Sequence, residues 1–119
     1  MTPEEVEALV HKKTRRPVIV RTITKSFGDD MAYLSYSIDD RNQLTIWHTE
    51  VPSRMQHLGV GGLLVERALN LTNDAEASLR LVCPFAKDYV ARHPELRERN
   101  IATKETIVER ESLESGQAF

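Results

Sequence analysis

The feature that most limits the fold of this chain is a change in hydrophobic period at Pro52. Before Pro52, apolar and polar residues alternate along two segments, which is typical of strands with one buried face. After it, the apolar residues follow helical spacing, at Val60, Leu64, Ala68 and Leu71. Another apolar stretch follows at 78–83. A strand, a helix and a strand in this order imply a right-handed crossover to a parallel neighbour, so the sequence predicts a βαβ unit.

Local signals predict the other elements of an α+β (α/β) fold. Thr2 and Pro3, with Glu5 three residues after the cap, predict a helix over residues 3–13. Pro84 starts a last short helix that reaches residue 92. The predicted sheet is mixed, with an antiparallel meander joined to the βαβ unit. The strands of the meander are expected at 18–25, 31–38 and 43–51, with turns at 26–30 and 39–42.

The chain has 119 residues, which is the size of one domain and excludes multi-domain enzymes and α/β barrels. We expect an N-terminal helix and extension over residues 1–17, a folded domain over 18–96 and a charged tail over 97–119. The tail is predicted to be a marginal helix or disordered, because few of its residues are apolar.

No segment is predicted to enter a membrane or to bind a metal. The longest stretch without a polar side chain, 58–65, is far shorter than the roughly 18 residues of a membrane helix. Glutamates near the N-terminus replace the basic start of a secretory signal, so we expect a cytoplasmic protein. The single cysteine, Cys83, forms neither an intrachain disulfide nor a Cys-x-x-Cys motif.

The junction before the long helix is rich in glycine and reads Gln56-His57-Leu58-Gly59-Val60-Gly61-Gly62. Glycine at a helix start costs backbone entropy, so the backbone is expected to approach another group closely. One candidate is a phosphate, because a helix N-terminus offers N–H groups and the positive end of the helix dipole. The other candidate is close packing of the helix on the sheet. The glycines alone do not choose between them.

Three motifs, which follow one another along the chain at 48–52, 56–61 and 83–85, resemble the GNAT N-acetyltransferase superfamily. The spacing Gln56-x-x-Gly59-x-Gly61, between a strand and a helix, is similar to its acetyl-CoA pyrophosphate loop. The segment 48–52 and the motif Cys83-Pro84-Phe85, followed by Tyr89 and 93–95, resemble its short YjdJ-type branch. That branch is a minimal domain without the usual long N-terminal helical pair.

The resemblance implies that acetyl-CoA lies in a cleft between two splayed parallel strands, here ending near Val51 and Cys83, and that CoA is released. Many members have Arg or Lys where this chain has Leu58. Arg54 either compensates from nearby or is a solvated surface residue. The residues implied in cofactor binding are Val51, Gln56, His57, Leu58, Gly59, Val60, Gly61, Gly62, Cys83 and Phe85.

The resemblance also implies catalytic roles at the ends of these strands. His48 is the first candidate for the base that deprotonates an amine, and Glu50 is the second. If the strand is regular, both share one face of it. Cys83 either takes the acetyl group covalently or only shapes the pocket near the thioester. Tyr89 is the candidate acid for the CoA thiolate.

The resemblance favours an acetyl-CoA-dependent N-acetyltransferase in which a small-molecule or peptide amine attacks directly. The alternative is a CoA-binding or protein-interaction module with little turnover, with a protein partner held by the tail. Lys12, Lys13, Arg15 and Arg16 form a basic run, but the chain carries a formal charge of −2 and no nucleic-acid motif. Nucleic acid is therefore not expected as a partner.

Overall fold

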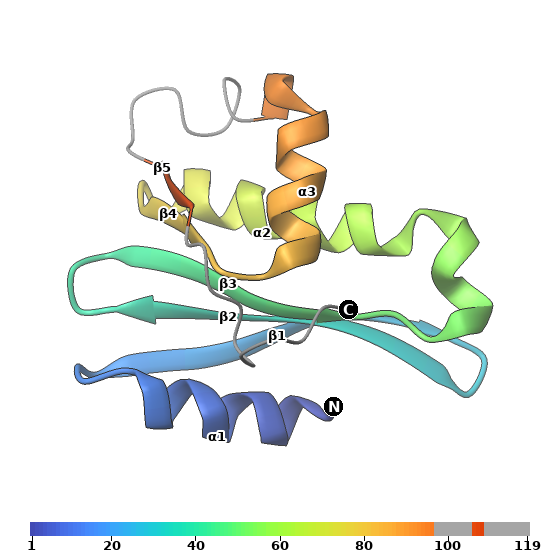
Figure 1. Cartoon of the computed structure of the whole chain (residues 1–119), viewed down its shortest axis with the longest axis horizontal. Helices are drawn as coiled ribbons and strands as arrows, with labels where there is room; N and C mark the ends of the chain where they lie inside the picture. Colours follow the sequence, from blue (N-terminus) through green and yellow to red (C-terminus); the bar gives the residue numbers. More distant parts are fainter. Residues whose placement is uncertain (97–105, 109–119) are drawn as a thin grey trace.

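The computed structural model describes residues 1–96 and 106–108. Figure 1 shows α1 on one face of a sheet and α2 and α3 on the other; we refer to these as the α1 face and the α2 face. The helices are α1 (Pro3–Lys13), the 3₁₀ helix η1 (Ser53–Leu58), α2 (Val60–Asp74) and α3 (Pro84–Arg92). The strands are β1 (Val18–Phe27), β2 (Asp30–Asp39), β3 (Gln43–Glu50), β4 (Ser78–Leu81) and β5 (Thr106–Val108).

The sheet is mixed, as the sequence predicts. Its strand order is β1-β2-β3-β4-β5. β1, β2 and β3 form the antiparallel meander, and α2 is the crossover that makes β4 parallel to β3. β5 pairs parallel with β4 inside the segment predicted to be a marginal helix or disordered, so that prediction is wrong for residues 106–108. The other tail residues, 97–105 and 109–119, lie outside the described part of the chain.

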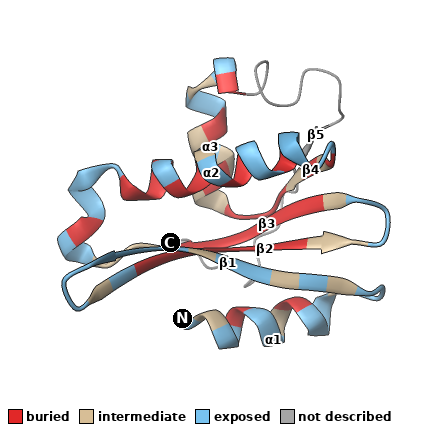
Figure 2. Ribbon diagram, turned by 180° about the vertical axis from the view of Figure 1, so that it is seen from behind, coloured by how far each residue is buried: buried red, intermediate tan, exposed pale blue. Residues whose placement is uncertain are grey.

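The larger core lies between the sheet and α2. Leu34, Leu44 and Ile46 project from β2 and β3 into it, and Leu64 and Ala68 meet them from α2. Figure 2 shows the resulting buried stripe along α2 and the buried centre of the sheet. The predicted helical stripe is thus confirmed at its centre, whereas Leu71, near the end of α2, is exposed. None of the described helices has the length and apolarity to cross a membrane.

A smaller core holds α1 on the other face. Thr2 and Glu5 form the predicted capping box, in which each side chain accepts a hydrogen bond from the other residue's backbone N–H. Val6 and Val10 of α1 are buried against Tyr33, Trp47 and Val82. α1 therefore covers the face of the sheet on which Trp47 lies.

A β-bulge at Trp47 changes which face each later residue of β3 occupies. Ser35 of β2 pairs with His48, and the next residue, Tyr36, pairs with Ile46, so Trp47 is an extra residue on β3. Before the bulge, Ile46 lies on the α2 face; after it, His48 and Glu50 lie on the α1 face. The two residues share a face as expected, because β3 is regular between them, beyond the bulge.

The parallel strands separate at this bulge. The register between β3 and β4 ends at Ile46 and Leu81. The carbonyl oxygen of Ile46 accepts hydrogen bonds from the backbone N–H groups of both Val82 and Cys83, each at 3.0 Å. Pro84 then turns the chain into α3, while β3 continues to Glu50. The place beyond Ile46, where β3 is no longer paired with β4, is the opening between parallel strands that the resemblance predicts.

Candidate functional site

His48 and Glu50 form a hydrogen-bonded pair at the end of β3. Their Nε2 and Oε1 atoms are 2.8 Å apart, and His48 is 8% exposed. The Met1 ammonium lies 3.4 Å from the same Oε1, and the Tyr33 hydroxyl donates to the Met1 carbonyl oxygen. Burial raises the pKa of Glu50, but the hydrogen bond from His48 and the Met1 charge outweigh it and hold the pKa below its ordinary value.

The charge on Glu50 fixes the tautomer of His48. An ionised carboxylate only accepts hydrogen bonds, so Nε2 of His48 carries the proton and Nδ1 of the neutral ring carries the lone pair. Ser35, the cross-strand partner of His48, has a buried hydroxyl without a hydrogen-bond partner among the described residues. The pair therefore combines an imidazole with an ionised carboxylate that accepts the Nε2 proton.

Cys83 lies at the same opening but on the α2 face. Its thiol is buried in the larger core, 3.4 Å from the hydroxyl oxygen of Thr49, and it accepts a 3.4 Å hydrogen bond from the Ala86 backbone N–H. Burial raises the pKa of Cys83, and these hydrogen bonds offset only part of that effect. Cys83 is a neutral thiol that caps α3, and its side-chain partner is Thr49.

The loop before α2 is a turn of 3₁₀ helix that ends at Gly59. Gly59 has a φ of +73°, a left-handed conformation that favours glycine. The Gln56 side chain braces this turn by donating to the Val51 carbonyl oxygen at 3.1 Å. Leu58 is 57% exposed, and Arg54 pairs with Asp30 at 3.4 Å. The first N–H groups of α2, which have no partner within the helix, lie directly after this exposed turn.

Gly61 and Gly62 are explained by close packing of α3 on α2. A Cβ atom on Gly61 would lie 2.6 Å from Cζ of Phe85, and one on Gly62 would lie 2.5 Å from Cε1 of Tyr89. Close packing on the sheet, one of the two explanations that the sequence leaves open, is wrong in its partner: these two glycines allow close packing, but of α3 and not of the sheet. The conformation of Gly59 accounts for the third, so the glycines themselves are no evidence for a phosphate.

Tyr89 lies over the first turns of α2. Its hydroxyl donates to Oε2 of Glu66 at 2.6 Å, and its ring stacks on His93 with centroids 4.2 Å apart. The hydrogen bond to Glu66, with a smaller contribution from burial, raises the pKa of Tyr89 to about 12. The hydroxyl is therefore engaged with α2.

A comparison of the sequence with protein families agrees with this geometry. The family model described as GCN5-related N-acetyltransferase matches residues 22–99, more than half of the chain. The chain belongs to the GCN5-related N-acetyltransferase family. No curated protein and no solved structure gives a significant match. The match includes β2, β3, α2, β4 and α3, and thus every predicted site residue of this GCN5-related domain.

Sequence reasoning did not find three partners of the predicted residues in this GCN5-related domain. Thr49 lies between His48 and Glu50, and its alternation with them is the one signal that could have assigned it to the opposite face. Glu66 contacts Tyr89 only through the packing of two helices, and Ser35 meets His48 only through the strand register. Neither contact leaves a local pattern in the sequence.

Proposed function

We propose that this protein is an acetyl-CoA-dependent N-acetyltransferase of the YjdJ-type branch, in which an amine attacks acetyl-CoA directly. The observation that carries the proposal is the separation of β3 from β4 beyond Ile46, with the pair of His48 and Glu50 beside the opening. Membership in the family supports the reaction class. The geometry of the opening supports the use of acetyl-CoA.

The proposed cofactor position uses two sets of backbone groups. The edge of β3 beyond Ile46 offers N–H and C=O groups with which the amides of a pantetheine arm can pair, as an added strand would. The N–H groups at the start of α2, after Gly59, suit a pyrophosphate. Leu58 contributes no charge, so backbone groups would supply most of the phosphate contacts.

In the proposed reaction, His48 takes a proton from the acceptor ammonium, which leaves a neutral amine. The amine nitrogen attacks the thioester carbon, the C–S bond of the tetrahedral intermediate breaks, and the CoA thiolate leaves, while the second proton of the attacking nitrogen passes to solvent. The raised pKa of Tyr89 and its hydrogen bond to Glu66 oppose the predicted acid role. We therefore assign return of the proton to the His48 imidazolium, which Glu50 stabilises.

Cys83 is proposed to shape the thioester pocket without becoming acetylated. Its raised pKa and its buried contacts with Thr49 and Ala86 support this choice over the covalent one. The acceptor is proposed to be a small-molecule or peptide amine in the cytoplasm, with no membrane partner. A protein partner for residues 97–119 also remains a proposal, and most of that segment lies outside the described residues.

The test combines acetyl-CoA binding with turnover on a panel of amines, followed by mass spectrometry of the acetylated products. We expect His48→Ala to lower kcat/KM by about 100-fold, the usual contribution of a general base, while calorimetry shows unchanged CoA affinity. His11→Ala removes an exposed histidine of α1 and is the matched control. Absence of binding of both acetyl-CoA and CoA would contradict the proposal.

The second candidate, a CoA-binding or protein-interaction module with little turnover, is favoured by one observation. The Met1 ammonium pairs with Glu50, so a cation already lies where an acceptor amine would meet the pair. This candidate predicts CoA binding without acetylation of any amine in the panel. Robust turnover that depends on His48 would rule it out.

A further inference from the structure

A row of three buried polar side chains of β2, at Tyr33, Ser35 and Ser37, lies on the α1 face beside the end of β3. Two of the three hydroxyl groups have partners. Tyr33 donates to the Met1 carbonyl oxygen, and Ser37 Oγ accepts from Nε1 of Trp47 at 2.7 Å. Ser35, which is 0% exposed, has a hydroxyl without a hydrogen-bond partner among the described residues.

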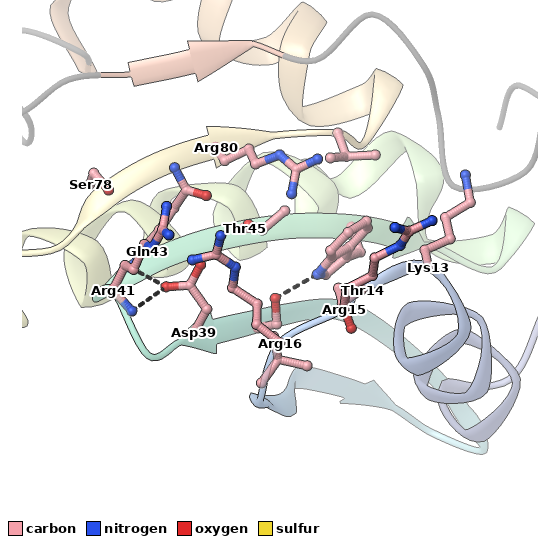
Figure 3. Close-up of a pocket in the computed structure, with 14 residues that line it drawn as sticks. Lys13, Thr14, Arg15, Arg16, Asp39, Arg41, Gln43, Thr45, Ser78 and Arg80 are labelled. Carbon is pink, nitrogen blue, oxygen red and sulfur yellow. Dashed lines mark hydrogen bonds between the residues drawn. The ribbon is translucent and has the colours of Figure 1, made fainter.

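This buried hydroxyl calls for an explanation, because an unpaired polar group in a protein interior costs free energy that alanine would avoid. A groove of about 730 Å³ crosses the same face (Figure 3). Ser37 and Trp47 line the groove, but Ser35 and His48 do not. A molecule in the groove would therefore not be the direct partner of the Ser35 hydroxyl.

The strand register points to a different partner. Ser35 lies directly opposite Thr22 of β1 and opposite His48 of β3. The Cβ atoms of such pairs are about 4.5 to 5.5 Å apart, so their side chains are neighbours. Thr22 is exposed, and water can serve its hydroxyl. His48 is buried, so its ring depends largely on groups of the protein.

The imidazole of His48 needs a further acceptor when it takes up a proton. The neutral ring has one N–H, at Nε2, which Glu50 accepts at 2.8 Å. Protonation adds a second N–H at Nδ1, the nitrogen nearer to the backbone. The charged and titratable groups around this pair, among the residues that the structure describes, are Glu50, the Met1 ammonium, Tyr33, Glu4 and Glu5. Ser35 is the side chain that the register places across from the ring.

We propose that Ser35 is a positioning residue for His48: its hydroxyl oxygen accepts the second N–H of the imidazolium, while Glu50 accepts the first. A change of the Ser35 χ1 rotamer brings the oxygen toward the ring without moving the strand. Charge strengthens such a hydrogen bond, so the bond tightens as the imidazolium forms.

The role of Ser35 in catalysis rests on the proposed function, in which His48 takes a proton from the acceptor ammonium. That proton creates the second N–H, and the bond to Ser35 breaks when the proton passes to the CoA thiolate. The contact between Ser35 and the imidazolium is a property of the protein itself. It can therefore be tested without acetyl-CoA.

The experiment follows the ring signals of His48 by NMR in the full chain, over about pH 5 to 9. The chain has four histidines, and the spectrum of His48→Ala assigns the signals. We expect the midpoint of the His48 titration to fall by at least about 0.5 pH units in Ser35→Ala, because the imidazolium loses an acceptor.

Thr22→Val is the matched control, since it removes the other hydroxyl that faces Ser35, from an exposed position. It should move the midpoint by less than about 0.2 pH units. Circular dichroism verifies the folding of both variants.

Turnover gives a second measurement of the same contact. Ser35→Ala should lower the plateau of kcat/KM by about three- to tenfold and shift its acid limb to lower pH. A purely structural role would lower the plateau without moving the limb.

An unchanged His48 titration in Ser35→Ala would overturn the proposal, and so would an equal change in Thr22→Val. If amines were acetylated while the titration stayed unchanged, the proposed function would stand and the role of Ser35 would fail. A lowered midpoint in a protein that acetylates no amine would support the contact and contradict the proposed function.

Discussion

At the scale of single residues, Cys83 and His48 lie at one opening of the sheet but in different surroundings. His48 has a carboxylate partner and lies on the α1 face, whereas Cys83 is buried on the α2 face beside a hydroxyl. The sequence and its resemblance propose both residues as site candidates. The face of His48 could not be predicted, because it depends on the extra residue at Trp47.

The buried thiol leads to a prediction about reactivity. We expect Cys83 of the native protein to react with iodoacetamide at least about tenfold more slowly at pH 7.5 than in the unfolded chain, because burial raises its pKa and blocks access. Mass spectrometry of the labelled protein measures the rate, and the absence of a second cysteine makes the assignment unambiguous.

Under the proposed mechanism, Cys83→Ala keeps most of the turnover. Its control is Thr49→Val, which removes the hydroxyl contact with the thiol but leaves the cysteine in place. An acetyl adduct on Cys83 after rapid acid quench, together with loss of activity in Cys83→Ala, would instead support the covalent route.

At the scale of helices and strands, hydrophobic period and capping signals predicted most of the fold. The bounds of α1 agree because its capping box is local in sequence, and α2 begins after Gly59 as its helical period indicates. η1 was not predicted, since it is a short 3₁₀ helix of six residues. β5 was missed because three residues with charged neighbours give no strand signal, and its partner β4 is remote in sequence.

The packing of α3 on α2 gives a prediction about Gly62. In the wild-type protein, Gly62→Ala should lower the free energy of unfolding by about 1 to 3 kcal/mol, because the added Cβ would lie 2.5 Å from the Tyr89 ring. In a Tyr89→Ala background the clash is gone, and the better helix propensity of alanine should raise that energy by up to about 1 kcal/mol. Urea denaturation of the four proteins measures both effects.

Asn70→Ala is the control for helix propensity, since Asn70 is an exposed residue of α2. It should not destabilise the protein in either background. If Gly62→Ala were equally destabilising with and without the Tyr89 ring, close packing would not be the reason for this glycine.

At the scale of the whole molecule, the two faces of the sheet have different roles. The α2 face holds the larger core and the loop proposed for the cofactor, while the α1 face carries the pair of His48 and Glu50 and a groove that Arg15, Arg41 and Arg80 line. The basic run near the end of α1 could be read from the sequence. The position of this run beside Arg41 and Arg80 could not be predicted, because these residues come together only when β2, β3 and β4 lie side by side.

Glu50 joins the start of α1 to the end of β3, so its ionisation should affect the stability of the whole fold. The folded state lowers its pKa, although burial alone would raise it. A carboxylate with a lowered pKa stabilises the folded state above its unfolded pKa, here 4.5, and loses that contribution as the pH falls through the folded value. The contribution should be at most about 1 kcal/mol, because the side chain is partly exposed and solvent screens its charge.

We therefore expect Glu50→Gln to have a Tm a few degrees below that of the wild type at pH 7, and the difference to disappear as the pH falls through the lowered pKa of Glu50. Differential scanning calorimetry across this range measures both values. Glu7→Gln removes the same charge from an exposed position of α1 and should leave the Tm nearly unchanged. A difference between Glu50→Gln and wild type that stayed constant down to pH 3 would mean that shape rather than charge at residue 50 supports the fold.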